Sequence, residues 1–134
     1  MTKKELNQIY YLNKEIKMYT KRLNELRNKS VVGGQKITGM PIGSGISDNV
    51  TDIAVNVLEL ERLIKLKKEQ CELEHIKITR YINGVDDSLM RLILSYRYIN
   101  NFTWNKIATY IGGGNTADSI RMLHHRFLKK SRKN

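Results

Sequence analysis

The chain has 134 residues, of which 40% are hydrophobic, and carries a formal net charge of +11. This length fits one domain or a small domain with an appendage, and no stretch approaches the roughly 20 apolar residues that span a bilayer. The lone Cys71 excludes an intramolecular disulfide, and no apolar signal-peptide segment follows Met1. We therefore expect a cytoplasmic protein whose basic charge favours a polyanionic partner.

The positive charge is concentrated near the two ends of the chain. Residues 1–30 contain eight Lys and Arg against three Asp and Glu, and residues 86–134 contain nine against three. Residues 31–85 contain seven of each. The neutral middle is typical of helices that contact other protein segments.

The first predicted element is a long amphipathic helix. Thr2 and Glu5 have the spacing of a capping box, so the helix should begin at Lys3. Apolar residues then recur every three or four positions, as in a coiled coil: Ile9, Leu12, Ile16, Tyr19, Leu23 and Leu26. The opposite face is either solvated or a second phosphate-contacting surface, and it carries Lys14, Lys17, Lys21, Arg22 and Asn24.

Residues 30–49 interrupt the periodicity and are predicted to form a flexible or functional loop. They contain Pro41, the only proline, and five of the nine glycines. The segment follows a helix and lacks the G-x-x-x-x-G-K-[ST] spacing, so we do not expect a nucleotide site there.

A second long helix should begin after a cap at Ser47 or Asp48 and end at Asn83-Gly84. Its inward stripe is Ile53, Val57, Leu60, Ile64, Lys67, Cys71, Glu74, Ile78 and Tyr81. Polar seam residues such as Lys67 and Glu74 commonly set register or oligomeric state. The helix either folds back on the first as an antiparallel hairpin or pairs with a second copy of the chain. With no period-2 alternation anywhere, the predicted class is all-α, with residues 1–84 as a hairpin or oligomerisation region.

Residues 85–134 are predicted to form a separate three-helix domain. The helices are expected over residues 86–100, 103–111 and 116–130, with Gly112 in the turn that needs a positive φ. The predicted inward residues are Leu89, Leu92, Ile93, Tyr96 and Ile99, then Ile107, Ala108 and Ile111, then Ile120, Leu123, Phe127 and Leu128, with a partly buried His124. A scaffold helix, a tight turn and a basic helix are typical of the helix-turn-helix, which enters the DNA major groove.

The third helix supplies the predicted DNA contacts. From Ile120 onward the chain has six Lys and Arg and no acidic residue. Outward residues near its start should reach base edges: Ser119, Arg121, Met122 and His125. Further residues should hold phosphates: Thr116, Arg126, Lys129, Lys130, Arg132 and Lys133. The alternative interpretation is a basic helix that only confers solubility.

The sequence gives no indication of catalysis. His75, His124, His125 and Cys71 lack the spacing of metal ligands, and Asp86-Asp87 is better explained as a helix start. Ser44 and Ser47 have no His/Asp partner at a suggestive position. We therefore expect no enzymatic activity, no metal and no cofactor.

Two C-terminal motifs resemble the sigma-70 region 4-type helix-turn-helix. They are the run Leu89–Ala108, which contains Phe102-Thr103-Trp104-Asn105-Lys106-Ile107-Ala108, and the basic run Ser119–Lys130. The start of the chain, Met1–Ile16, and the loop Gly39–Ala54 are similar to segments of phage-encoded late transcriptional regulators of the ArpU/RinA-like type. The turn through Gly113, Gly114 and Asn115 is longer than in the sigma pattern, so base contacts do not transfer residue by residue.

The resemblance implies a non-enzymatic activator of phage late or packaging genes in a bacterial host. Its helix-turn-helix would bind double-stranded promoter DNA, while the N-terminal helices would form a homodimer or contact RNA polymerase. Two alternatives remain open. One is a DNA-packaging protein resembling a small terminase subunit, and the other is an interaction module that inhibits a host factor.

Overall fold

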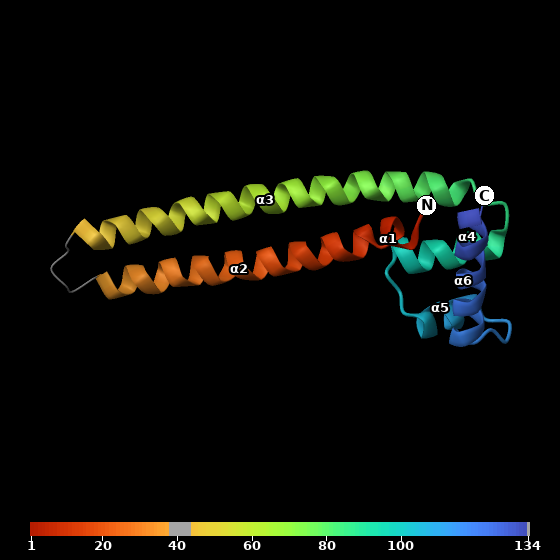
Figure 1. Cartoon of the computed structure of the whole chain (residues 1–134). Coiled ribbons are helices and arrows are strands. Elements are labelled where there is room, and N and C mark those ends of the chain that lie inside the picture. Colours follow the sequence, from red (N-terminus) through yellow and green to blue (C-terminus); the bar gives the residue numbers. More distant parts are fainter. Residues whose placement is uncertain (38–43, 134) are drawn as a thin grey trace. The chain divides into compact units, whose positions relative to one another are not determined.

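The computed structural model describes the backbone of residues 1–37 and 44–133, and side chains over residues 1–29 and 50–132. Every regular element in this part of the chain is helical, which confirms the predicted all-α class (Figure 1). None of these helices is both long enough and apolar enough to cross a membrane.

The N-terminal helix begins where the capping box predicts. Helix α1 spans Lys3–Leu6, and the hydroxyl of Thr2 accepts a hydrogen bond from the Glu5 amide at 3.2 Å. Helix α2, Gln8–Ile37, follows after one residue, and the Tyr11 amide bonds the Asn7 carbonyl across the junction. Helix α2 therefore continues directly from α1.

Helices α2 and α3, Ser44–Asn83, pack as an antiparallel hairpin (Figure 1). The predicted end of α3 at Asn83 is confirmed. Immediately after it, the Gly84 amide donates a hydrogen bond to the Tyr81 carbonyl at 3.1 Å. The prediction of a loop over residues 30–49 is wrong at both edges, because α2 runs on to Ile37 and α3 begins before Ser47. Extending an existing helix adds one hydrogen bond per residue, which offsets the cost of the glycines within it. Residues 38–43 lie outside the described part.

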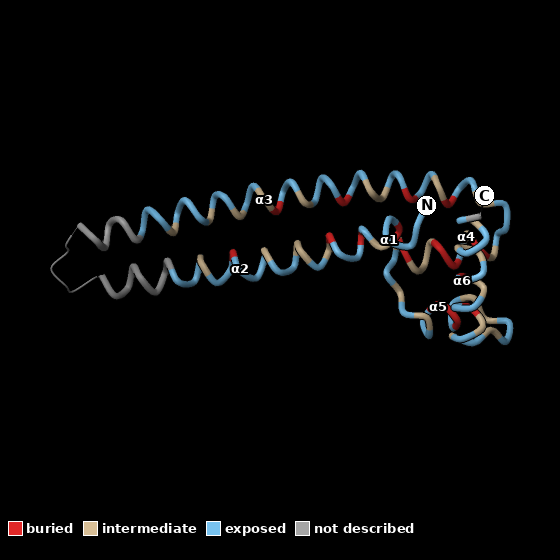
Figure 2. Tube along the Cα trace, viewed as in Figure 1, coloured by how far each residue is buried: buried red, intermediate tan, exposed pale blue. Residues whose placement is uncertain are grey.

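One compact unit, Asn13–Gln70, is the body of this hairpin. Leu23 and Ile64 are buried in its seam. Figure 2 shows buried positions on both α2 and α3. The lysine on the predicted seam forms an ion pair across the hairpin, from Lys67 Nζ to a Glu15 carboxylate oxygen at 3.1 Å. Arg27 and Glu61 form a second cross-hairpin pair at 2.5 Å. The polar seam position thus has a partner within the chain.

The other compact unit joins Met1–Leu12 to Cys71–Asn134. Its fully buried side chains come from the N-terminal segment, the end of α3 and the C-terminal helices: Leu6, Ile9, Ile78, Ile93, Leu94, Ile107 and Ile120. The boundaries of the two compact units lie after Leu12 and after Gln70, and not at residue 85. The functional boundary at residue 85 stays a prediction. The first twelve residues thus belong to the C-terminal unit, and Leu6 and Ile9 contribute to its core.

The C-terminal helices are α4 (Ser88–Leu94), the π-helical turn η1 (Ser95–Ile99), α5 (Trp104–Ile111) and α6 (Ala117–Lys133). Asp87 caps α4 by accepting from the Leu89 amide at 3.3 Å. Asn101, at φ 57°, ends the first predicted helix as expected. The prediction for Leu92 is wrong, because 46% of it is exposed. The buried face passes instead through Met90, Ile93, Leu94 and Tyr98.

Candidate nucleic-acid interface

The turn between α5 and α6 is built from three glycines with positive φ. Gly112, Gly113 and Gly114 have φ of 67°, 66° and 79°, a region that side chains with a Cβ rarely adopt. Asn115 closes the turn, donating both its backbone and its side-chain N–H to the Gly112 carbonyl, at 3.2 and 2.8 Å. The long turn has a defined conformation that fixes where α6 begins.

Helix α6 then starts with a reciprocal cap. The Ser119 amide donates to the Thr116 hydroxyl at 3.1 Å, and the Thr116 amide donates to the Ser119 hydroxyl at 2.9 Å. The Ser119 hydroxyl also donates to the Thr116 carbonyl at 2.9 Å. Such an exchange satisfies amides that a helix start leaves free. Both predicted DNA contacts at the start of α6 therefore already have intramolecular partners.

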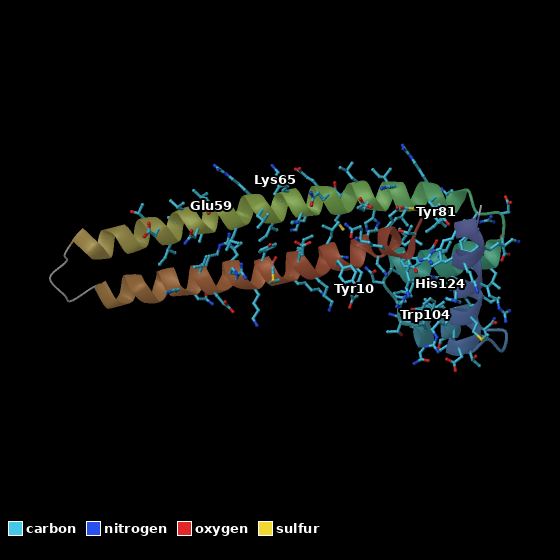
Figure 3. The ribbon with its side chains drawn as sticks, viewed as in Figure 1. Tyr10, Glu59, Lys65, Tyr81, Trp104 and His124 are labelled. Carbon is cyan, nitrogen blue, oxygen red and sulfur yellow. The ribbon has the colours of Figure 1, made fainter. Side chains whose placement is uncertain are left out.

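His124 anchors the middle of α6 in the core, as its position on the apolar side predicts. Only 3% of it is exposed, and it shares a hydrogen bond with the Tyr98 hydroxyl. Trp104 packs edge-on against the imidazole with 4.9 Å between ring centroids (Figure 3). This cluster ties α6 to η1 and α5, so it sets the rotation of α6.

The charge states of this cluster are also fixed by its surroundings. Burial and, to a smaller extent, electrostatic interactions with Lys3, Arg97 and His125 lower the pKa of His124 from 6.5 to about 4. Burial likewise raises the pKa of Tyr98 to about 12. Both groups are therefore neutral at pH 7, and the core of the unit carries no net charge there.

Three aromatic rings from η1, the segment before α5 and α5 itself stack together, a contact that the sequence did not predict. Tyr96, Phe102 and Tyr110 stack with ring centroids 5.3–5.8 Å apart. Lys106 Nζ lies 4.0 Å from the Phe102 centroid. These contacts bind the segment that enters α5 to η1, and so support the helix against which α6 packs.

The rotation set by this core turns the predicted base-reading side chains Arg121, Met122 and His125 to the surface, with Met122 53% exposed. Ser119 is half-buried at the cap. Arg121 is held by Asp118 one turn earlier, with 2.7 Å between guanidinium and carboxylate. Thr116 and four of the predicted phosphate contacts are also exposed: Arg126, Lys129, Lys130 and Arg132. The side chain of Lys133 lies outside the described residues.

The start of the chain lies beside this face of α6, which sequence reasoning missed. A groove of about 290 Å³ is lined by Met1, Thr2, Lys3, His125, Leu128, Lys129 and Arg132. A second groove of about 330 Å³ places Lys3 and Asn7 with Arg121, Met122 and His125 among its lining residues. Lys3 therefore adds a cation next to the predicted reading residues. The only sequence signal was the basic charge of residues 1–30.

Comparison with known proteins adds no further constraint. The sequence matches no protein-family model, and searches among curated proteins and solved structures gave no significant match. Function must therefore be argued from the site itself.

Proposed function

We propose that this chain is a DNA-binding transcriptional regulator that reads duplex promoter DNA with α6. The observation that carries the proposal is the exposed basic face of a helix whose start and rotation are both fixed. The helix starts at a cap that follows a three-glycine turn, and the buried His124 fixes its rotation. Together these features determine which side chains face outward. Regular presentation of such a face is what a recognition helix requires.

The exposed side chains divide into two groups by chemistry. Arg121 can bond guanine through two N–H groups, Met122 can contact a thymine methyl, and His125 can donate or accept at a base edge. A guanine that binds Arg121 has to compete with Asp118, whose carboxylate already bonds the same guanidinium. Ser119 would have to exchange its cap contacts to reach a base.

The remaining cations fit phosphates, which set affinity more than specificity. Lys129, Lys130 and Arg132 continue the face toward its C-terminal end, and Arg126 flanks it. Lys3 extends the same positive surface from the neighbouring segment. Within this proposal, the resemblance to phage late-gene regulators suggests promoters of late or packaging operons and RNA polymerase as a further partner.

The test is selection of bound duplexes from a random pool, followed by fluorescence anisotropy on the selected duplex and a scrambled one. With about five phosphate contacts, affinity for both should fall by about 500-fold between 50 and 200 mM salt. Binding that is absent even at 50 mM salt would refute DNA binding and favour the protein-interaction alternative. A ring of eight or more copies in solution would favour packaging over regulation.

Two single variants test the division of roles on α6. Arg121→Ala should lose about 1–3 kcal/mol of binding to the selected duplex and little to the scrambled one. Lys129→Ala should weaken both duplexes equally and reduce the salt slope by about one. If both variants lose discrimination to the same extent, the assignment of faces is wrong.

A further inference from the structure

Helix α3 carries a second apolar stripe that the hairpin does not use. Val55, Leu58, Leu66, Leu73 and Ile76 are each between 47% and 66% exposed, although they are large apolar residues. With Arg62 and Glu69, they follow one another at spacings of three and four along the helix. This is the spacing of a coiled-coil seam.

The stripe lies on the side of α3 opposite the hairpin seam. At about 100° per residue, its seven residues fall within an arc of about 80°. The inward residues Ile64, Cys71 and Ile78 fall roughly on the opposite side by the same count, and all three are buried. All seven stripe residues belong to one continuous helix, so helix geometry alone sets their positions.

We propose that this stripe, defined as Val55, Leu58, Arg62, Leu66, Glu69, Leu73 and Ile76, pairs with the same stripe of a second copy in antiparallel orientation. Its order is nearly palindromic about the middle of α3. An antiparallel partner centred between residues 65 and 66 places Val55 opposite Ile76 and Leu58 opposite Leu73. Leu66 then lies next to its own symmetry mate, so the apolar residues of each copy cover those of the other.

The two charged stripe residues specify this orientation. In the antiparallel pair, Arg62 of one copy lies opposite Glu69 of the other, and the contact occurs twice by symmetry. An in-register parallel pair would instead place Arg62 against Arg62 and Glu69 against Glu69, which is repulsive. Within the described residues neither side chain forms an ion pair, so both are available to a second copy.

The first experiment measures the association of the full chain by sedimentation equilibrium from 1 to 100 µM, without DNA. The wild-type chain should form a dimer, and Leu66→Lys should raise its dissociation constant at least about tenfold by placing charges at the symmetry axis. Met18→Lys is the matched control, because Met18 is 45% exposed but lies on α2. Circular dichroism should show unchanged helicity in both variants.

Charge exchange provides the second variant set and tests the orientation. Arg62→Glu and Glu69→Arg should each weaken the dimer, and the double variant should restore it. A monomeric wild-type chain at 100 µM, a dimer equally affected by Met18→Lys and Leu66→Lys, or a double variant without rescue would overturn the proposal. Because these readouts contain no DNA, their failure is distinguishable from a failure of the proposed DNA binding.

Discussion

Two regions of the molecule present exposed basic residues on a helix, and they are built differently. On α2, Lys14, Lys17, Lys21 and Arg22 are exposed on a helix that packs against α3 in the hairpin. On α6, the basic face belongs to a helix that is capped, follows a fixed turn and is anchored through His124. Charge alone attracts phosphates, whereas sequence reading also requires side chains held at fixed positions. Within the proposed function, this difference favours α6 over α2 as the recognition helix.

The largest expected difference between the two regions is in the free energy of unfolding that each loses when a buried side chain is shortened. Ile120→Ala removes a fully buried side chain from the C-terminal unit, where only limited collapse is possible, and should cost about 3–5 kcal/mol. Ile64→Ala, in the hairpin seam, should cost about 2 kcal/mol because its surroundings are more open. Urea unfolding followed by fluorescence of Trp104, the only tryptophan, and by circular dichroism would measure the two losses. Equal losses would mean that the regions are equally well packed.

The second prediction concerns pH and His124. Its pKa is about 4 in the folded chain and near 6.5 when unfolded, so the neutral imidazole stabilises the fold. This stability is complete above pH 6.5 and is lost as pH falls toward 4, by about 3 kcal/mol in total. Urea unfolding of wild type and His124→Gln at pH 7.5, 5.5 and 4.5 would measure it. A wild-type loss no steeper than that of the Gln variant would contradict the assignment.

The third prediction tests the turn before α6. Gly112→Ala forces a Cβ into a backbone with φ of 67° and ψ of −150°, which should cost about 1–3 kcal/mol. Gly84→Ala is the control, because an added Cβ there meets only ordinary contacts. Thermal unfolding would compare the two variants. If Gly84→Ala is as costly as Gly112→Ala, then the positive φ is not the cause.

The smallest expected effect is in the hairpin seam. Lys67 is only 22% exposed and its ion pair with Glu15 is partly solvated, so the attraction is largely offset by desolvation. Lys67→Met should change the free energy of unfolding by less than about 1 kcal/mol, as measured by urea unfolding. A loss above about 2 kcal/mol would show that this ion pair does hold the hairpin together.

Local signals in the sequence predicted much of this structure. The cap at Thr2, the apolar stripes of α2 and α3, and the positive φ of Gly112 each depend on residues close in the chain. The exposure of Leu92 was not predictable in this way, since it depends on how α4 packs. Nor was the position of Lys3 beside α6, because it results from contact between the two ends of the chain. Side chains on the outer face of α6 were identified from spacing, while the partner that they bind stays a proposal.

The most direct test of the central claim is hydrogen–deuterium exchange of the full chain with and without the selected duplex. The proposed function predicts slower exchange in α6, around Arg121–Lys129, and in the segment that contains Lys3. It predicts no change across Lys14–Arg22 of α2. Protection of the α2 segment with α6 unchanged would contradict the account, because it would place DNA on the hairpin and leave the fixed basic face without a role in binding.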